Sequence, residues 1–126
     1  MDCPREQQLV EIAEHLANPE RFADFVAYAD GGKPVGLAEA AMRTDYVNGT
    51  TSSPVAFLEG VYVLPDARRQ GVAAALVDAV CNWARERGCR ELASDALLEN
   101  ERSHAVHRAL GFEETERVVF FRKPLA

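Results

Sequence analysis

Residues 57–73 (FLEGVYVLPDARRQGVA) combine an apolar strand pattern with residues that a plain strand does not need. Glu59 and Gly60 interrupt the apolar run. A glycine inside a strand indicates a β-bulge, which separates the strand from its neighbour and leaves backbone N–H and C=O groups unpaired on that side. An extended ligand that carries amide groups can pair with them.

The strand is followed by the turn R-x-x-G-x-A at residues 68–73 and then by an amphipathic helix pattern. Small residues in this turn let the backbone approach a ligand closely, while the free N–H groups and the positive dipole end of the helix attract an anion. The turn therefore suits a pyrophosphate. A diphosphate joined to a strand-like amide chain describes coenzyme A.

Two carboxylates are placed to serve an amine that attacks a thioester. Such an amine must first lose a proton, and Glu59 and Asp95 are expected at the ends of adjacent central strands, where open α/β sheets usually bind ligands. They can hold the ammonium group and pass its proton to water, while a backbone N–H near Val61 meets the developing oxyanion. The plainer interpretations are a structural ion pair between Glu59 and an arginine, and a turn role for Asp95.

Hydrophobic periodicity and turn residues predict the elements that position these residues. In chain order they are a helix over 5–17, strands over 22–29, 34–42 and 55–64, a helix over 71–87, a short strand over 91–95, a helix from the cap Asn100 to Gly111, and one or two strands over 112–123. Val106, Ala109 and Leu110 are expected to face inward from the last helix. This order predicts an α/β fold, in which helices cover a mixed sheet.

The composition fits one globular domain over residues 1–126, with 48% hydrophobic and 27% charged residues. No apolar run can cross a bilayer and the N-terminus lacks a secretory pattern, so a cytoplasmic protein without membrane contact is expected. The formal net charge of −6 opposes nucleic acid and favours a polycation as partner, although acidity can also serve solubility alone. The three cysteines lack ligand spacing, and His104 and His107 lack a further ligand, so no metal is predicted.

The R-x-x-G-x-A turn after an apolar strand resembles the acetyl-CoA signature of the GCN5-related N-acetyltransferases. Four further segments resemble, in the same order, the aminoglycoside 6′-N-acetyltransferases of bacterial drug resistance: YVNG at 46–49, FLEG at 57–60, ASD at 93–95 and GFEETERVVFFRK at 111–123. The resemblance runs from about residue 5 to the C-terminus. It implies a mixed, mostly antiparallel sheet, from which the first strand and helix of the family are missing in this chain.

The same resemblance implies the residues that bind acetyl-CoA as co-substrate. The main chain of Val61, Tyr62 and Val63 would pair with the pantetheine arm and the acetyl carbonyl, and Asn100 would contact the cofactor near its thiol. The pyrophosphate would be wrapped by the turn and the first helical residues, namely Arg69, Gln70, Gly71, Val72, Ala73 and Ala74.

The aminoglycoside contacts implied by the resemblance are Tyr46, Glu59, Asp95 and Glu116, the last reached across a dimer interface. Glu59 and Asp95 would be catalytic, in direct transfer of acetyl to the 6′-amine of the drug. Tyr46 can instead pack on the surface, and Glu116 can form a solvated pair with Arg117.

Two other functions fit the same residues. One is acetyl transfer to another amine, such as a polyamine or a protein N-terminus, because the acids suit any polycation. The other is a non-catalytic acyl-CoA-binding module. The strand pattern over 118–121 is apolar on both faces, which predicts a homodimer in which one side packs on a partner.

Overall fold

The computed structural model describes residues 11–15 and 21–126. The chain divides into two compact units, of which the first ends at Asp95 and the second begins at Ala96. Almost all the regular structure belongs to the first unit. The second contains one helix and an irregular tail.

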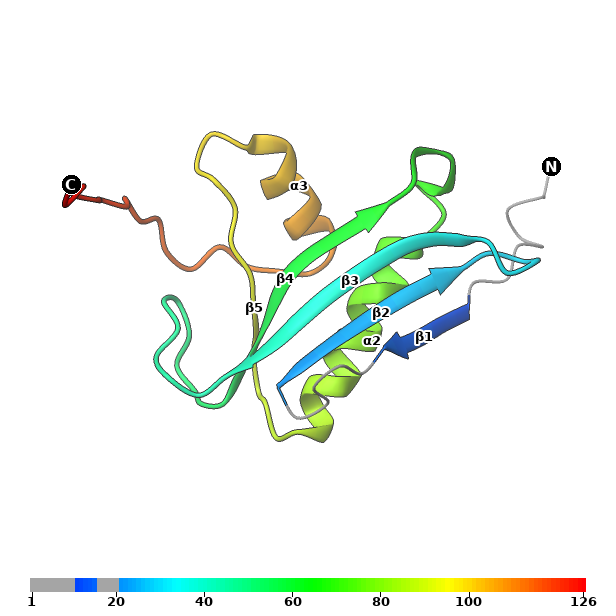
Figure 1. The fold of residues 1–126 in the computed structure, drawn as a ribbon, viewed down its shortest axis with the longest axis horizontal. Coiled ribbons are helices and arrows are strands. Elements are labelled where there is room, and N and C mark those ends of the chain that lie inside the picture. The colour runs from blue at the N-terminus through cyan, green and yellow to red at the C-terminus, as the bar shows by residue number, and fades with distance from the viewer. Residues whose placement is uncertain (1–10, 16–20) are drawn as a thin grey trace. The chain divides into compact units, whose positions relative to one another are not determined.

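A five-stranded sheet in the order β1-β2-β3-β4-β5 forms the first unit (Figure 1). The pairs β1–β2, β2–β3 and β3–β4 are antiparallel, and β5 runs parallel to β4. The mixed, mostly antiparallel sheet is therefore confirmed, and so are the strands predicted over 22–29, 34–42 and 55–64. The strands are Glu11–His15 (β1), Phe22–Tyr28 (β2), Pro34–Arg43 (β3), Val55–Val63 (β4) and Leu92–Ala93 (β5).

The predicted helix over 5–17 is wrong where the structure describes it. Residues 11–15 form β1, which pairs antiparallel with β2 so that Ile12 lies opposite Ala27. The remaining positions of that helix lie outside the described residues. Ile12 and Ala13 are neighbours in sequence and fit a strand as well as a helix, and pairing with β2 satisfies backbone groups along an otherwise open strand edge. The long-range pairing overrides the local pattern.

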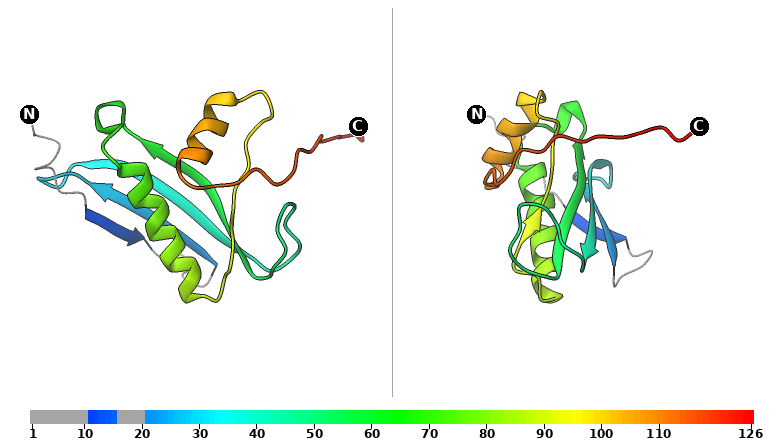
Figure 2. Two further views of the ribbon diagram at one scale, coloured as in Figure 1. Left: turned by 180° about the vertical axis from the view of Figure 1, so that it is seen from behind. Right: turned by 90° about the vertical axis from the view of Figure 1, so that its left-hand side faces the viewer.

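Helix α2, Val72–Glu86, covers one face of the sheet (Figure 2). Its apolar side is buried, with Leu76 and Val80 fully enclosed. A side chain at Gly36 of β3 would lie 3.0 Å from both Leu76 and Val72, so this glycine lets the helix approach the sheet closely. The helix predicted over 71–87 is thereby confirmed.

A smaller apolar cluster is built from Val47, Val55 and Phe57, with Ala93 packed against it. Val47 belongs to the loop between β3 and β4, and Phe57 to β4. The cluster therefore fixes this loop to β4 and to the short strand β5. Strand β5 itself spans only two of the five residues predicted for it.

The second unit contains helix α3, Glu101–Ala109. Its predicted cap is confirmed, because the Asn100 side chain accepts a hydrogen bond of 3.0 Å from the backbone N–H of Ser103. The expected inward face is wrong for Val106, which is 49% exposed, and for Ala109, which is also exposed.

The strands predicted over 112–123 are absent, because these residues form no strand or helix. Val119, Phe120 and Phe121 have the apolar composition of a strand but are largely exposed. A strand exists only when its backbone groups pair with another strand, and this segment pairs with none within the described part of the chain. Composition alone therefore could not decide the conformation of the tail.

Candidate active site

An open strand edge lies where β4 and β5 part. Ala56 pairs with Leu92 and Phe57 with Ala93, and there the pairing ends while β4 continues to Val63. Along residues 58–63, the side of β4 that faced β5 has no strand partner in the part of the chain that the structure describes. An extended amide chain can add to such an edge by backbone hydrogen bonds.

The β-bulge that the sequence predicts lies on the other side of β4, in its pairing with β3. Pairing with β3 resumes at Gly60, so the open groups result from the end of β5 and not, as expected, from the bulge. Glu39 of β3 lies opposite Gly60, and Ala40 lies opposite Leu58, so Glu59 is the extra residue. Gly60 itself has room, because a side chain there would meet nothing closer than the Glu39 carboxylate at 4.0 Å. The extra residue of the bulge is therefore Glu59, although Gly60 was the residue that predicted the bulge.

The turn before α2 leaves the N-terminus of the helix open to an anion. Gly71 has the left-handed φ of 79°, and no side chain caps the first turn of the helix. Arg69 also has a positive φ, of 64°. Hydrogen bonds of 3.2 Å from Arg68 to the Val63 carbonyl and from Gln70 to the Asp66 carbonyl hold the turn. Its uncapped N–H groups and the helix dipole form a site that favours phosphate oxygens.

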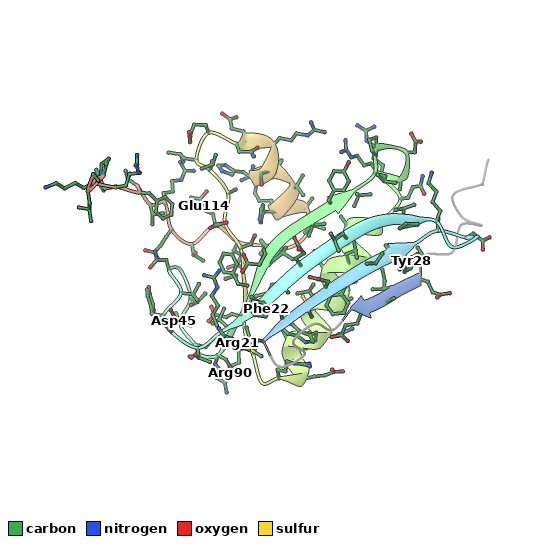
Figure 3. All side chains as sticks on the ribbon, in the orientation of Figure 1. Arg21, Phe22, Tyr28, Asp45, Arg90 and Glu114 are labelled. Atoms are coloured by element: carbon green, nitrogen blue, oxygen red, sulfur yellow. The ribbon has the colours of Figure 1, made fainter. Side chains whose placement is uncertain are left out.

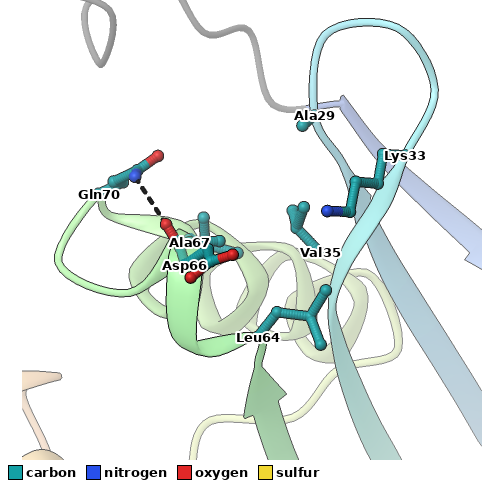
Figure 4. Close-up of a pocket in the computed structure, with 8 residues that line it drawn as sticks. Ala29, Lys33, Val35, Leu64, Asp66, Ala67 and Gln70 are labelled. Carbon is teal, nitrogen blue, oxygen red and sulfur yellow. Dashed lines mark hydrogen bonds between the residues drawn. The ribbon is translucent and has the colours of Figure 1, made fainter.

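A small hollow lies on the hairpin side of this turn (Figure 4). Lys33 lines it from the hairpin between β2 and β3, and Val35 lines it from β3. Asp66 and Gln70 line it from the turn before α2. Its volume of about 100 Å³ accommodates a few water molecules but no pantetheine arm. The open edge of β4, unlike this hollow, offers a long ligand a row of backbone groups.

The Glu59 carboxylate forms an ion pair with Arg43, at 3.0 Å between Oε2 and the guanidinium. The guanidinium carbon also lies 4.0 Å from the centre of the Phe57 ring. Both members of the pair are partly open to solvent, with side chains 40% and 41% exposed. The plainer interpretation of Glu59 as half of an ion pair with an arginine is therefore correct.

Asp95 lies just beyond the end of β5, whereas Glu59 lies inside β4 and not at a strand end as expected. Each lies two residues beyond the last pair of the parallel ladder, Phe57 with Ala93. The expected adjacency of their strands is confirmed, but β5 is the outer strand of the described sheet rather than a central one. Both acids are exposed, as a site for a soluble cation requires.

The loop that carries Tyr46 is held by a network of hydrogen bonds. Asp45, labelled in Figure 3, lies on this loop between β3 and β4. Thr50 donates its hydroxyl to the Val47 carbonyl at 2.7 Å. Glu91 accepts hydrogen bonds from the Ser52 hydroxyl and from the backbone N–H of Thr51. The loop is thus tied to the start of β5, and Tyr46, 73% exposed, is displayed on its surface.

Glu91 is a site residue that the sequence analysis missed. The hydrogen bond from Ser52, followed by that from Thr51, holds the pKa of Glu91 below its usual range. The signal in the sequence is the run of hydroxyl residues over 50–53, whose donors need an acceptor. The acceptor lies 39 and 40 residues further along the chain, so only the folded sheet identifies it.

Asn100 and Glu116 both belong to the second unit. The Asn100 side-chain oxygen serves as the cap of α3. Glu116 is exposed, and the suggested pair between Glu116 and Arg117 is wrong, because Arg117 bonds Glu114 at 2.8 and 3.1 Å. The hydrogen bond and the charge of Arg117 lower the pKa of Glu114, the acid three residues before it.

Comparison with known proteins decides the family. Residues 2–112 match the acetyltransferase (GNAT) family. The chain belongs to the GNAT family. It is 57% identical over 117 residues to an aminoglycoside N(6′)-acetyltransferase type 1 from Stenotrophomonas maltophilia, which covers 93% of this chain and 76% of that GNAT protein.

Solved structures agree with this assignment. The GNAT chain superposes on aminoglycoside N-acetyltransferase AAC(6′)-Iy in complex with CoA with a TM-score of 0.87, 41% identity, and coverage of 97% of this chain and 99% of that one. A second structure of AAC(6′)-Iy, in complex with the bisubstrate analogue CoA-S-monomethyl-acetylneamine, gives a TM-score of 0.78 at 57% identity, covering 82% and 70%. The family that the motifs indicated is thereby confirmed.

Neither helix of the described residues has the length and apolar composition that a membrane span needs. Within the same residues, no three His, Cys, Asp or Glu side chains gather in a way that would hold a metal ion.

Proposed function

We propose that this GNAT protein transfers acetyl from acetyl-CoA to the 6′-amine of an aminoglycoside, as one N-acetyltransferase domain over residues 1–126. The observation that carries the proposal is the open edge of β4, which begins beyond Phe57 and leads toward the turn before α2. Relatives at 57% identity named aminoglycoside N(6′)-acetyltransferase support the choice of substrate.

The chain offers partners for each part of acetyl-CoA. The main chain of Val61, Tyr62 and Val63 lies on the open edge and would pair with the amides of the pantetheine arm. The pyrophosphate would be held at the uncapped helix by the N–H groups of residues 69–74. Asn100 would contact the cofactor near its thiol. Acetyl-CoA, when bound, supplies an acetyl group activated as a thioester.

Carboxylates around the start of the edge would bind the amine. Glu59 and Asp95 hold the ammonium group next to the thioester and pass its proton to water, because only the neutral amine attacks. A backbone N–H near Val61 stabilises the oxyanion that develops on the thioester carbonyl. Tyr46 would form one side of the amine site, on a loop that is fixed by the packing of Val47.

Glu116 would complete the amine site across a homodimer. The apolar segment 118–121 is exposed in the single chain, and burying it against a second copy would remove apolar surface from water. We expect a dimer by sedimentation and a cytoplasmic enzyme. A monomer that turns over kanamycin normally would refute the role given to Glu116.

A thiol-release assay with acetyl-CoA tests the function. Thiol release should be fast with kanamycin and slow with spermidine, and Glu59→Gln and Asp95→Asn should each lower kcat/KM for kanamycin by about 10²-fold. Asp78→Asn, which removes an equal charge from the exposed side of α2, serves as control. Preference for spermidine would select a polyamine acetyltransferase, and CoA binding without thiol release on any amine would select a binding module.

A further inference from the structure

Arg43 forms an ion pair with the Glu59 carboxylate, which is the group that the proposed reaction assigns to the amine. Arg43 is the last residue of β3 and lies opposite Val55 of β4. Side chains two residues apart on a strand share a face, so Val55 and Phe57 stand on the side toward which Arg43 turns. The bulged Glu59 joins that side, and the guanidinium contacts both Phe57 and Glu59.

The two contacts of Arg43 differ in how readily they yield. An ion pair as exposed as this one is weak, because water screens it and both side chains lose freedom in forming it. The contact at 4.0 Å with the Phe57 ring is a cation–π interaction that does not depend on Glu59. The guanidinium can therefore release the carboxylate and keep its place over the ring.

We propose that Arg43 is an internal competitor that fills the cation site of Glu59 until an amine substrate displaces it. An incoming amine then competes with an internal cation. This inference rests on the proposed function, since it takes Glu59 as the site of the amine.

The competition predicts that removing Arg43 strengthens amine binding. Arg43→Met keeps an unbranched apolar stem over Phe57 and removes the charge, so the site loses its competitor and keeps its packing. The coupling typical of an exposed ion pair corresponds to about a two- to five-fold fall in the Kd for kanamycin. Arg43→Lys keeps a cation at the site and should bind kanamycin nearly as the wild type does.

Calorimetric titration of kanamycin into the CoA complex tests this directly. The expected pattern is a lower Kd for Arg43→Met in the wild-type background and no effect of Arg43→Met when Glu59 is replaced by Gln. Methylguanidinium chloride should raise the Kd of Arg43→Met toward the wild-type value, because it refills the vacated site. Arg85→Met is the matched control: it removes the same charge from an arginine on α2 whose partner is Asn82.

A Kd for Arg43→Met that is unchanged or higher would overturn the inference, and so would an equal fall in Arg85→Met. Thermal midpoints of all variants show whether each is folded. Binding is measured without an acetyl donor, so an enzyme that binds kanamycin but releases no thiol would refute the proposed function alone. Absence of kanamycin binding in every variant would refute both.

Discussion

The two halves of the proposed site differ in whether backbone or side-chain groups form them. The half for acetyl-CoA consists of backbone: the edge of β4 and the first turn of α2, both held from behind by buried side chains such as Leu76. The half for the amine consists of exposed side chains, Glu59, Asp95 and Tyr46, of which Glu59 is held by a solvent-exposed ion pair. Backbone geometry set by a core tolerates surface change, whereas an arrangement of exposed side chains depends on each contact, on salt and on pH.

The largest effect is expected where the backbone half meets the core. Leu76→Ala should lower the free energy of unfolding by about 2–5 kcal/mol, because Leu76 is fully buried beneath the sheet. Denaturant unfolding measures this, with Asp78→Ala on the exposed side of α2 as the control. A loss below about 1 kcal/mol would mean that α2 is held mainly by other contacts and that the comparison overstates the role of the core.

A smaller effect is expected at Gly71, whose left-handed φ of 79° an alanine adopts only at a cost of about 1–2 kcal/mol. A Cβ there has no protein atom within 4 Å, and it lies in the turn that is proposed to bind the pyrophosphate. Gly71→Ala should therefore weaken both folding and CoA binding. Gly31→Ala, with φ of 89° and equally open surroundings, should weaken folding alone. Equal CoA affinities by calorimetry in the two variants would contradict the anion site.

Substitutions at Asn100 distinguish its structural role as the cap of α3 from its proposed role in binding CoA. Asn100→Ala should lower the stability of α3 by about 1 kcal/mol, whereas Asn100→Asp keeps an oxygen that caps Ser103. Amide exchange within α3 and calorimetry of CoA binding measure the two roles. If Asn100→Asp binds CoA normally, the side-chain amide has no part in holding the cofactor, and the proposed contact fails.

The smallest effect is expected for the pH dependence of stability that Glu91 contributes by holding the loop that carries Tyr46. Glu91 has a lowered pKa in the folded state because Ser52 and Thr51 donate to its carboxylate. A lowered folded pKa gives stability that is present above the unfolded pKa of about 4.3 and is lost as pH falls through the folded value. The difference in thermal midpoint between wild type and Glu91→Gln should therefore shrink below about pH 4. A constant difference would show that ionisation of Glu91 does not hold the loop.

Local patterns predicted most of the first unit. The strands that became β2, β3 and β4 alternate and are separated by glycine-rich or polar turns, and α2 has both an apolar side and a terminal glycine, Gly88 with φ of 83°. The turn before α2 followed from three residue types at fixed spacing. These features depend only on neighbours in sequence.

What the sequence could not supply depends on partners distant in the chain. The strand at 11–15 exists because β2 offers an edge, and the tail over 112–123 has no strand partner among the described residues. Arg43 reaches Glu59 only because the β3–β4 register brings residues 16 apart together. Glu91 meets Thr51 across a separation of 40. In each case the missing information is a register or a pairing, which no local pattern contains.

The brevity of β5 has an evolutionary consequence. β-Branched residues at the positions after Ala93 would favour strand pairing there. Such substitutions would extend the pairing of β5 with β4 and raise stability. The same substitutions would seal the opening through which a ligand reaches the edge of β4. Selection for thermal resistance and selection for catalysis would then pull this short segment in opposite directions, so a library sorted only for heat tolerance should accumulate inactive members here.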